Sequence, residues 1–458
     1  MGHNKPNIIY ITFDSVRTSH LSFNGYKKNT TPFIDSLIRK GIYFKNAFAT
    51  GPGSSVSFVG IFTSTYPLDY GGYSYIKKPR VLFPEALKEA GYTTIGVHSS
   101  PYLSDYFGYN RGWDQFLYLN HFKKYSGVSM SPGFQKGTLK SKTLKKATAS
   151  HQWLKNKIPP LAAIFKIIEK SLLLFRKIIK DIFKFKPAFF TGEEMNREVE
   201  RILDGAQNRP VFLWIHYLDA HAPYGLFEKN GHGLIKKIKY HISDIAAFLF
   251  GEVNFINKLF LPIHKSLYDE SLKYLDGNIK NLFRFLENRG ILNQNSVIIM
   301  NSDHGEEFLE HESFGHPQKL FNVNIKIPLI FYSPGKKFGE PRIVSNPVSL
   351  IDLGPTILKI AGIHQPDSYK GNDIFDRKNK EVVVQASESS GDLTNPDWTG
   401  IAIIHNNYKL IHWKKQKLLF SLDDVEEKNN LYEIKKDIVK NLEEIKEKYS
   451  IGQYQEKL

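Results

Sequence analysis

The chain has 458 residues, of which 41% are hydrophobic and 24% are charged. This balance is normal for a globular protein and excludes a mostly disordered chain. The absence of cysteine excludes disulfides, thiolate zinc sites and a cysteine nucleophile. The 62 basic and 46 acidic side chains give a net charge of +16.

Most of the positive charge lies in one segment. Residues 131–190 contain 14 Lys and Arg and two acidic residues, a local charge of 14 − 2 = +12. The rest of the chain is nearly neutral, so we expect no nucleic-acid partner. Within this segment, residues 161–186 alternate apolar and lysine faces, which predicts an amphipathic helix that could contact an anionic membrane surface. Of the two interpretations, we favour a helix packed on the body with its lysines in solvent.

The N-terminus does not resemble a secretion signal. Its apolar run over residues 8–11 ends at Asp14, which is too short for the core of a signal peptide. No stretch approaches 18 uncharged apolar residues, so we expect no transmembrane helix. The predicted location is cytoplasmic, with contact to a membrane surface as a further possibility.

Apolar runs alternate with helical patterns over the first three quarters of the chain. Strands are expected at residues 7–13, 93–98, 211–216, 296–301 and 329–332. Helices are expected at residues 31–40, 83–90 and 268–288. This alternation predicts an α/β fold with a doubly wound, mainly parallel sheet and helices on both of its faces.

The pattern changes near residue 370. Short strands separated by tight turns are expected at residues 382–384, 401–404, 409–412 and 418–422, followed by a charged helix at 435–449. We therefore expect a catalytic α/β domain over residues 1–370 and a small antiparallel subdomain over residues 371–458. Helical insertions are expected in the catalytic domain at 131–190 and 228–262.

Polar clusters follow three of the predicted strands. Asp14 follows the first strand, His216 to His221 end another, and Asp303 and His304 follow a third. In parallel sheets, active residues collect at the carboxyl ends of the strands. An adjacent carboxylate and imidazole could turn toward one metal ion. Asp14 could join them or cap a helix.

A glycine-bracketed run of small residues contains a candidate nucleophile. In residues 51–58, Ser54 lies where a helix could begin, and a helix N-terminus offers free N–H groups to an anion. A metal-bound serine hydroxyl would also ionise more readily than a free one. An ordinary loop is the alternative explanation of such a run.

Histidine and lysine residues supply candidate acids and anion ligands. His221 could protonate a leaving-group oxygen, whereas His216 is expected to point into the core and have a structural role. His316 and Lys319, in a later loop, could bind a tetrahedral anion or simply be solvated.

Taken in order, these segments resemble the sulfatase family of the alkaline phosphatase superfamily. The matching segments are 6–17 with the metal-binding aspartate, 31–35, 62–67, 302–306, 327–330 and 350–357. They resemble the family's "TPNLD", "LTGRYP", "SDHGE", "VPLI" and "SLIDLAPTIL" motifs. The resemblance extends over about residues 5–120, 195–225 and 265–435, and it implies an alkaline-phosphatase-like fold.

The resemblance places Ser54 at the family's nucleophile position, but with departures. The family pattern has proline and arginine where this chain has Val56 and Phe58, and a second aspartate where it has Ser15. The segment that supplies sulfate-binding Lys and His aligns with residues 97–100. Because the proline and arginine belong to the signal for conversion to formylglycine, we expect Ser54 to stay a serine and to attack phosphorus.

The resemblance also implies a role for each candidate residue. One divalent metal ion, with zinc or manganese favoured over calcium, would be held by Asp14, Ser54, Asp303 and His304. The implied catalytic side chains are Ser54, His221, His316 and Lys319. The implied substrate contacts are Ser99, Arg17 and His216.

These roles predict a metal-dependent hydrolase of phosphate or sulfate esters. Its substrate would be an anionic ester, either a small molecule or linked to a glycan or lipid. The alternatives are a transferase that moves a phospho-headgroup to a lipid or glycan acceptor, and a catalytically degenerate protein that binds a surface.

Overall fold

The computed structural model describes residues 5–121, 189–203, 209–225, 254–376, 381–388 and 399–449. The chain divides into one compact unit of Met1–Leu119 with Phe189–Leu458 and a second of Asn120–Ala188. The predicted amphipathic helix at 161–186, and most of both predicted insertions, lie outside the described residues. None of the helices in the described ranges is long and apolar enough to span a bilayer.

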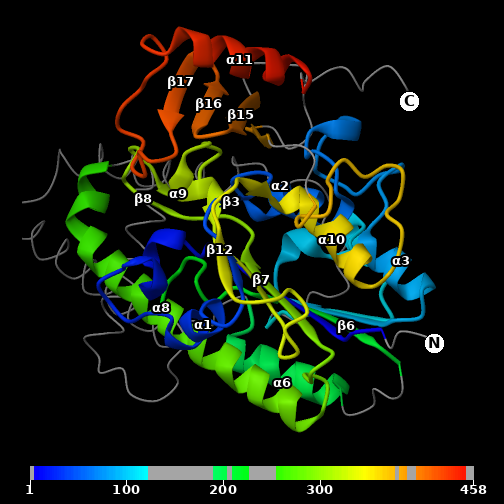
Figure 1. Ribbon diagram of the computed structural model, residues 1–458. Coiled ribbons are helices and arrows are strands. Elements are labelled where there is room, and N and C mark those ends of the chain that lie inside the picture. Colours follow the sequence, from blue (N-terminus) through cyan, green and yellow to red (C-terminus); the bar gives the residue numbers. More distant parts are fainter. Residues whose placement is uncertain are drawn as a thin grey trace, which may run out of the picture. The chain divides into compact units, whose positions relative to one another are not determined.

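An eight-stranded sheet forms the centre of the larger unit (Figure 1), in the order β12-β2-β11-β7-β1-β6-β4-β5. Its strands, in that order, are Arg342–Val344, Ile42–Phe44, Leu329–Tyr332, Val297–Ser302, Ile8–Phe13, Val211–Tyr217, Thr93–His98 and Gln115–Tyr118. All are parallel except β11, which is antiparallel to both of its neighbours. The predicted mostly parallel α/β sheet is therefore confirmed.

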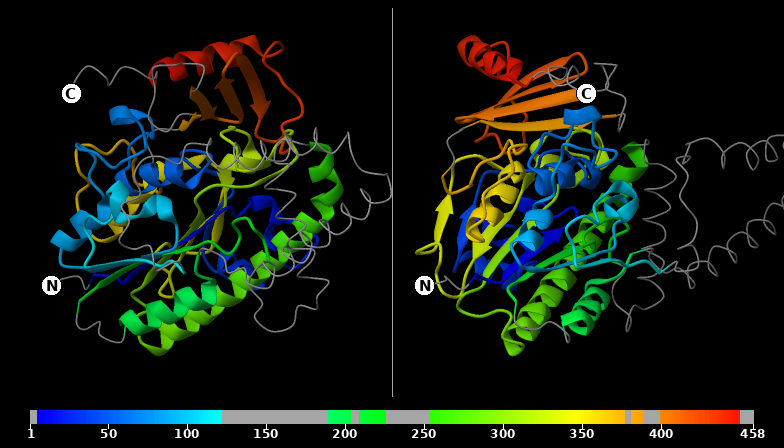
Figure 2. Two further views of the ribbon diagram at one scale, coloured as in Figure 1. Left: turned by 180° about the vertical axis from the view of Figure 1, so that it is seen from behind. Right: turned by 90° about the vertical axis from the view of Figure 1, so that its right-hand side faces the viewer.

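The central strands are buried on both faces, which explains their continuous apolar sequences. One face is covered by α2 (Ser54–Thr63), α3 (Phe83–Glu89) and α10 (Leu353–Ile360). The other is covered by α1 (Pro32–Ile38), α6 (Gly192–Leu203) and α8 (Asn254–Asn288), and Figure 2 shows both layers. The helix α8 begins 14 residues before the predicted start at 268, because it continues through Pro262. Part of the predicted insertion at 228–262 thus belongs to it.

A second, smaller sheet follows near the C-terminus. Its four antiparallel strands are β14 (Val382–Ser387), β15 (Thr399–His405), β16 (Tyr408–Trp413) and β17 (Gln416–Ser421). One face packs under α11 (Lys436–Glu447), and the other packs on Phe48, Leu320 and Ile325 of the body. The predicted antiparallel sheet and terminal helix are therefore confirmed.

Short elements connect these layers. They are β3 (Ala47–Phe48), β10 (Lys326–Ile327) and β13 (Val348–Ser349), which form one small sheet, the pair β8 (Glu307–Phe308) and β9 (Phe314–Gly315), and α9 (Asn322–Ile325).

Candidate active site

The carboxyl ends of β1, β6 and β7 meet at one edge of the central sheet. The backbone N–H of Asp14 donates to Tyr217 O at 2.9 Å, and that of Asp303 donates to Phe13 O at 3.0 Å. His216 is the penultimate residue of β6. Because the three strands are parallel neighbours, residues far apart in the sequence converge here.

Ser54 is the first residue of α2, so the predicted helix start is confirmed. The preceding Gly53 is extended and acts as the N-cap. Ser54 Oγ lies 3.1 Å from Asp14 Oδ2 and 3.2 Å from His304 Nε2. The helix thus presents its first hydroxyl directly to the cluster at the sheet edge.

The protonation of His304 follows from its surroundings. Its Nδ1 lies 2.8 Å from the carbonyl oxygen of Gly305, which can only accept, so Nδ1 carries the proton. In the neutral ring, the lone pair of Nε2 then faces Asp14 Oδ1 and Asp303 Oδ2, each at 3.6 Å. An imidazole lone pair between two carboxylates is unfavourable unless a cation lies among them.

His216 has a similar arrangement. Thr12 Oγ1 accepts from Trp214 Nε1 at 3.0 Å and lies 2.9 Å from His216 Nδ1 and 3.4 Å from Ile215 O. If the threonine hydroxyl donates to that carbonyl, its oxygen accepts a hydrogen bond from His216 Nδ1–H. In the neutral ring, His216 Nε2 then carries a lone pair 3.4 Å from Asp14 Oδ2.

The two carboxylates at this edge differ in electrostatics. Burial raises the pKa of Asp303 to about 7, and the neighbouring charge of Asp14 adds to the effect. Burial alone would raise the pKa of Asp14 too, but positive charge on the imidazoles of His221, His216 and His304 outweighs it and holds that pKa well below the usual range. Two buried carboxylates with adjacent imidazoles are typical of a metal site.

The residues at this edge fit a divalent metal ion. Ligand atoms of Asp14, His216 and Asp303 lie within 4.8 Å of one another, and all three side chains are buried. Asp303 Oδ2 and His216 Nε2 also lack any hydrogen-bond partner. The structure thus places His216 with the carboxylates of the candidate metal site, whereas the family resemblance implied a substrate contact for it. Ser54 and His304 adjoin this group, and the predicted four-ligand set stays a prediction.

A second group lies beside the first. Glu306 is fully buried, and it accepts from the Tyr224 hydroxyl at 2.5 Å and pairs with His316 Nδ1 at 3.0 Å. The His316 ring centroid lies 4.7 Å from that of His304 and 5.2 Å from that of His221. The structure therefore brings His221, the predicted acid, and His316, a predicted anion ligand, to the edge of the Asp14 cluster.

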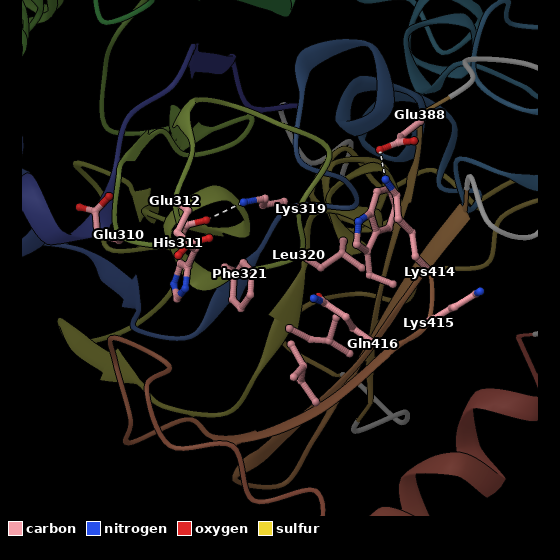
Figure 3. A pocket seen from close by; sticks show the side chains of 13 residues that line it. Glu310, His311, Glu312, Lys319, Leu320, Phe321, Glu388, Lys414, Lys415 and Gln416 are labelled. Carbon is pink, nitrogen blue, oxygen red and sulfur yellow. Dashed lines mark hydrogen bonds and ion pairs between the residues drawn. The ribbon is translucent and has the colours of Figure 1, made fainter. Parts of the chain in front are cut away.

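Two predicted residues have other partners. Lys319 Nζ donates to the carbonyl oxygen of His311 at 2.5 Å and lines a separate cavity (Figure 3). Arg17 forms an ion pair with Glu310 at 2.9 Å. Within the described part of the chain, neither side chain forms a hydrogen bond or an ion pair with Asp14, His216, Asp303 or His304. Their roles in catalysis and substrate binding stay predictions.

Ser99 is held by backbone contacts. Its hydroxyl donates to Leu119 O at 2.6 Å and accepts from Phe190 N at 2.8 Å. Both contacts join separate segments of the chain, so the position has a structural role in addition to the predicted substrate contact.

Phe58 occupies the position of the family's motif arginine. Its ring is buried, with the centroid 4.8 Å from that of His216 and 5.7 Å from that of Trp214. The Phe58 side chain thus packs against the His216 imidazole. An aromatic ring here supplies packing where the motif would supply a cation.

Sequence reasoning missed three residues of the site. Thr12 fixes the orientation of His216, and Tyr224 and Glu306 fix that of His316. Glu306 could have been suspected from its position two residues after His304. No local signal marks Thr12, which lies inside an apolar strand.

Comparisons with known proteins agree with this geometry. The sequence pattern of the Sulfatase family matches residues 6–363. The chain is 23% identical to arylsulfatase K of Danio rerio over 390 residues, which cover 82% of this chain and 68% of that protein. It resembles the phosphonate monoester hydrolase of Agrobacterium radiobacter with a TM-score of 0.69 and 17% identity, covering 98% and 95% of the two chains.

A further solved structure, a complex with D-glucosamine-2-N,6-O-disulfate as substrate, matches with a TM-score of 0.66 and 17% identity and covers 99% of this chain and 100% of that chain. These structural likenesses support the fold. The family match and the buried Asp and His cluster support hydrolase chemistry. The chain belongs to the sulfatase family, ester hydrolases of the alkaline phosphatase superfamily.

Proposed function

We propose that the protein is a metal-dependent hydrolase of phosphate esters that uses the unmodified Ser54 hydroxyl as its nucleophile. The observation that carries the proposal is the position of Ser54 Oγ, 3.1 Å from Asp14 Oδ2 and 3.2 Å from His304 Nε2. A hydroxyl at the N-terminus of a helix and at the edge of a metal cluster is well placed to attack an anionic ester.

The residues at the sheet edge would divide the chemistry. A divalent ion held by Asp14, His216 and Asp303 would supply positive charge that favours the Ser54 alkoxide. Ser54 Oγ loses its proton to solvent and forms a bond to phosphorus, while the bond from phosphorus to the leaving oxygen breaks. Water then cleaves the phosphoserine and restores the serine.

The leaving oxygen needs a proton, and two imidazoles lie near the cluster. His221 and His316 have ring centroids 5.2 Å apart. Glu306 holds His316 Nδ1, so the Nε2 atom of His316 is the one left to reach the substrate. A positioned general acid typically contributes a rate factor of about 10² to 10⁴.

The residues around Ser54 favour a phosphate ester over a sulfate ester. Val56 and Phe58 are buried and packed in the apolar layer under the sheet, at the positions where the family's modification signal has proline and arginine. Without that signal we infer that Ser54 remains a serine. The relatives include an arylsulfatase and a phosphonate monoester hydrolase, so both ester classes belong in the test.

The decisive experiment is a turnover screen of the full chain. It compares p-nitrophenyl phosphate, bis(p-nitrophenyl) phosphate, p-nitrophenyl phenylphosphonate and p-nitrophenyl sulfate, each with Zn²⁺, Mn²⁺ or Ca²⁺. Ser54→Ala should lower the best activity by about 10³-fold or more. Ser55→Ala, the next hydroxyl on the same helical turn, is the matched control and should stay within about threefold of the wild type.

Two results would contradict the proposal. One is equal turnover by Ser54→Ala and the wild type. The other is turnover of the sulfate ester alone, together with a formylglycine mass for the Ser54 peptide. Transfer of the phosphoryl group to added glycerol, in place of water, would favour the transferase alternative.

A further inference from the structure

A cavity of about 850 Å³ lies outside the metal cluster, between a loop of the body and the C-terminal sheet. The loop of the body lines it with His311, Lys319 and Phe321. The small sheet lines it with Trp413, at the end of β16, and with Lys414 and Lys415 in the turn that follows. Figure 3 shows the two sets of side chains on separate segments. The cavity is therefore formed only when the small sheet packs on the body.

Trp413 forms a fixed aromatic platform in this cavity. It pairs with Gly400 across the sheet, and a Cβ atom at Gly400 would lie 2.0 Å from Trp413 Cε3. The indole therefore covers the Cα of Gly400, and no larger residue fits beneath it. The ring is only half-buried, so the rest of its surface faces the cavity.

The charges around this platform are not all neutralised. Lys414 lies 5.8 Å from the Trp413 ring centroid and pairs with Glu388 at 2.7 Å, and Arg17 pairs with Glu310. Lys415 has no hydrogen bond or ion pair with any residue in the described ranges.

Lys319 supplies a second cation at the opposite wall. Among the described residues, its ammonium donates only to the His311 carbonyl oxygen, which carries no full charge. Of the three carboxylates in the lining, Glu310 and Glu388 are already paired, and the third, Glu312, is exposed to water and forms no ion pair with a lysine in the described ranges. Lys319 and Lys415 therefore remain able to bind an added anion.

The cavity is joined to the active site by one loop. Lys319 is three residues beyond His316 and directly follows Gln318. Gln318 Nε2 lies 3.5 Å from the position that a Cβ atom on Gly53 would occupy, next to Ser54. A substrate that reaches from Ser54 past Gln318 would enter the cavity at Lys319.

We propose that this cavity binds an anionic sugar unit of the substrate, away from the ester that reacts at Ser54. The apolar face of a pyranose ring would pack on Trp413, and its acidic substituents would bind Lys319 and Lys415. The inference rests on the proposed ester hydrolysis, because it identifies the distal part of that substrate. A single platform among charged groups favours a glycan over a lipid chain, which needs a continuous apolar channel.

The test is calorimetric binding of a heparin-derived hexasaccharide to the full chain, in the wild type and in Ser54→Ala. Trp413→Ala should weaken binding by about tenfold. Lys415→Glu, a change at an exposed position that leaves the packing intact, should weaken it several-fold and reduce its salt dependence. Lys417→Ala is the matched control, because Lys417 lies toward Glu443 of α11 on the other face of the sheet, and it should bind like the wild type.

Several results would overturn the inference. They are equal affinities of Trp413→Ala, Lys415→Glu and the wild type, equal binding of uncharged maltohexaose, and no wild-type binding at millimolar hexasaccharide. Trp413-dependent binding to anionic phospholipid vesicles without hexasaccharide binding would indicate a membrane site instead. Trp413-dependent binding of the hexasaccharide without turnover of any ester would leave this inference intact and contradict only the proposed function.

Discussion

The edge of the central sheet and the cavity on the C-terminal sheet both gather charged side chains, but in opposite settings. At the sheet edge, Asp14, His216, Asp303 and His304 are all at most 2% exposed. In the cavity, Lys414 and Lys415 are exposed, and Lys319 and Trp413 are partly buried. Water screens the charges of the exposed lysines but cannot screen those of the buried groups at the sheet edge.

Burial makes the interactions at the sheet edge strong, and exposure makes those at the cavity weak. Buried groups interact strongly with one another, so removal of one changes the pKa values and the metal affinity of the rest. Exposed lysines contribute small, separable amounts to binding. Substitutions should therefore have large effects at the sheet edge and graded effects at the cavity.

The largest expected effect is on metal binding at the sheet edge. Asp303→Asn removes a buried negative charge and should lower both the turnover of the best ester and the metal content after dialysis, with activity falling by about 10³-fold. Excess metal should restore part of the activity. Asp367→Asn, at an exposed aspartate, is the control and should change neither. Full metal content in Asp303→Asn would contradict the assignment of the cluster.

The next effect concerns the contact between the C-terminal sheet and the segment of the body that carries Leu320 and Asn322. Lys409 of β16 is fully buried, pairs with Glu427, and donates to Leu320 O at 3.0 Å and Asn322 Oδ1 at 2.8 Å. Lys409→Met leaves Glu427 buried without its partner. It should lower the free energy of unfolding by about 3 to 5 kcal/mol, measured by urea denaturation.

An exposed ion pair provides the control for that measurement. Lys336 and Glu340 pair at 3.0 Å, with side chains 64% and 79% exposed. Lys336→Met should change the free energy of unfolding by about 0.5 kcal/mol or less. A loss at Lys409 as small as the loss at Lys336 would show that the buried network does not hold the small sheet to the loop.

A buried histidine gives a prediction about pH. Burial, with the charges of Arg17, Lys265 and Lys28, lowers the pKa of His20 to about 2. In the unfolded chain the pKa is about 6.5, so between these values the unfolded state binds a proton that the folded state does not. Stability is therefore lost as the pH falls through that window, by about 2 kcal/mol from pH 7 to pH 5.

Substitution of His20 should isolate this contribution. His20→Phe binds no proton, so its loss of stability from pH 7 to pH 5 should be about 2 kcal/mol smaller than that of the wild type. Denaturant unfolding at the two pH values measures the difference. Equal losses in both proteins would mean that the ring of His20 is protonated in the folded state.

The smallest expected effect concerns the orientation of His316. Tyr224→Phe removes the hydroxyl that donates to Glu306 at 2.5 Å and leaves the aromatic packing in place. The hydrogen bond to a carboxylate contributes about 1.5 kcal/mol, so kcat should fall by about tenfold while KM changes little. Tyr268→Phe, on a neighbouring ring that bonds Ser15 O instead, is the control for packing. An unchanged kcat in Tyr224→Phe would remove the positioning role of Glu306.

The fold class and several candidate residues of the site could be predicted from the sequence. Apolar runs of strand length, alternating with helical periods, gave the parallel sheet, and the polar residues directly after those runs gave Asp14, Asp303 and His304. These features are local, because a strand end and a helix start are encoded within a few residues. The family motifs added the position of Ser54.

The tertiary structure alone decided how these groups face one another. Both faces of β6 are buried and apolar, so the sequence could not tell which way His216 points, and only the packing of β6 beside β1 turns it to Asp14. The reversed direction of β11 and the pairing of Glu306 with His316 likewise depend on residues distant in the chain. The position of the Trp413 ring also depends on a distant residue, because the indole lies over Gly400 of the neighbouring strand. Such contacts are set by strand register and packing, which no local pattern records.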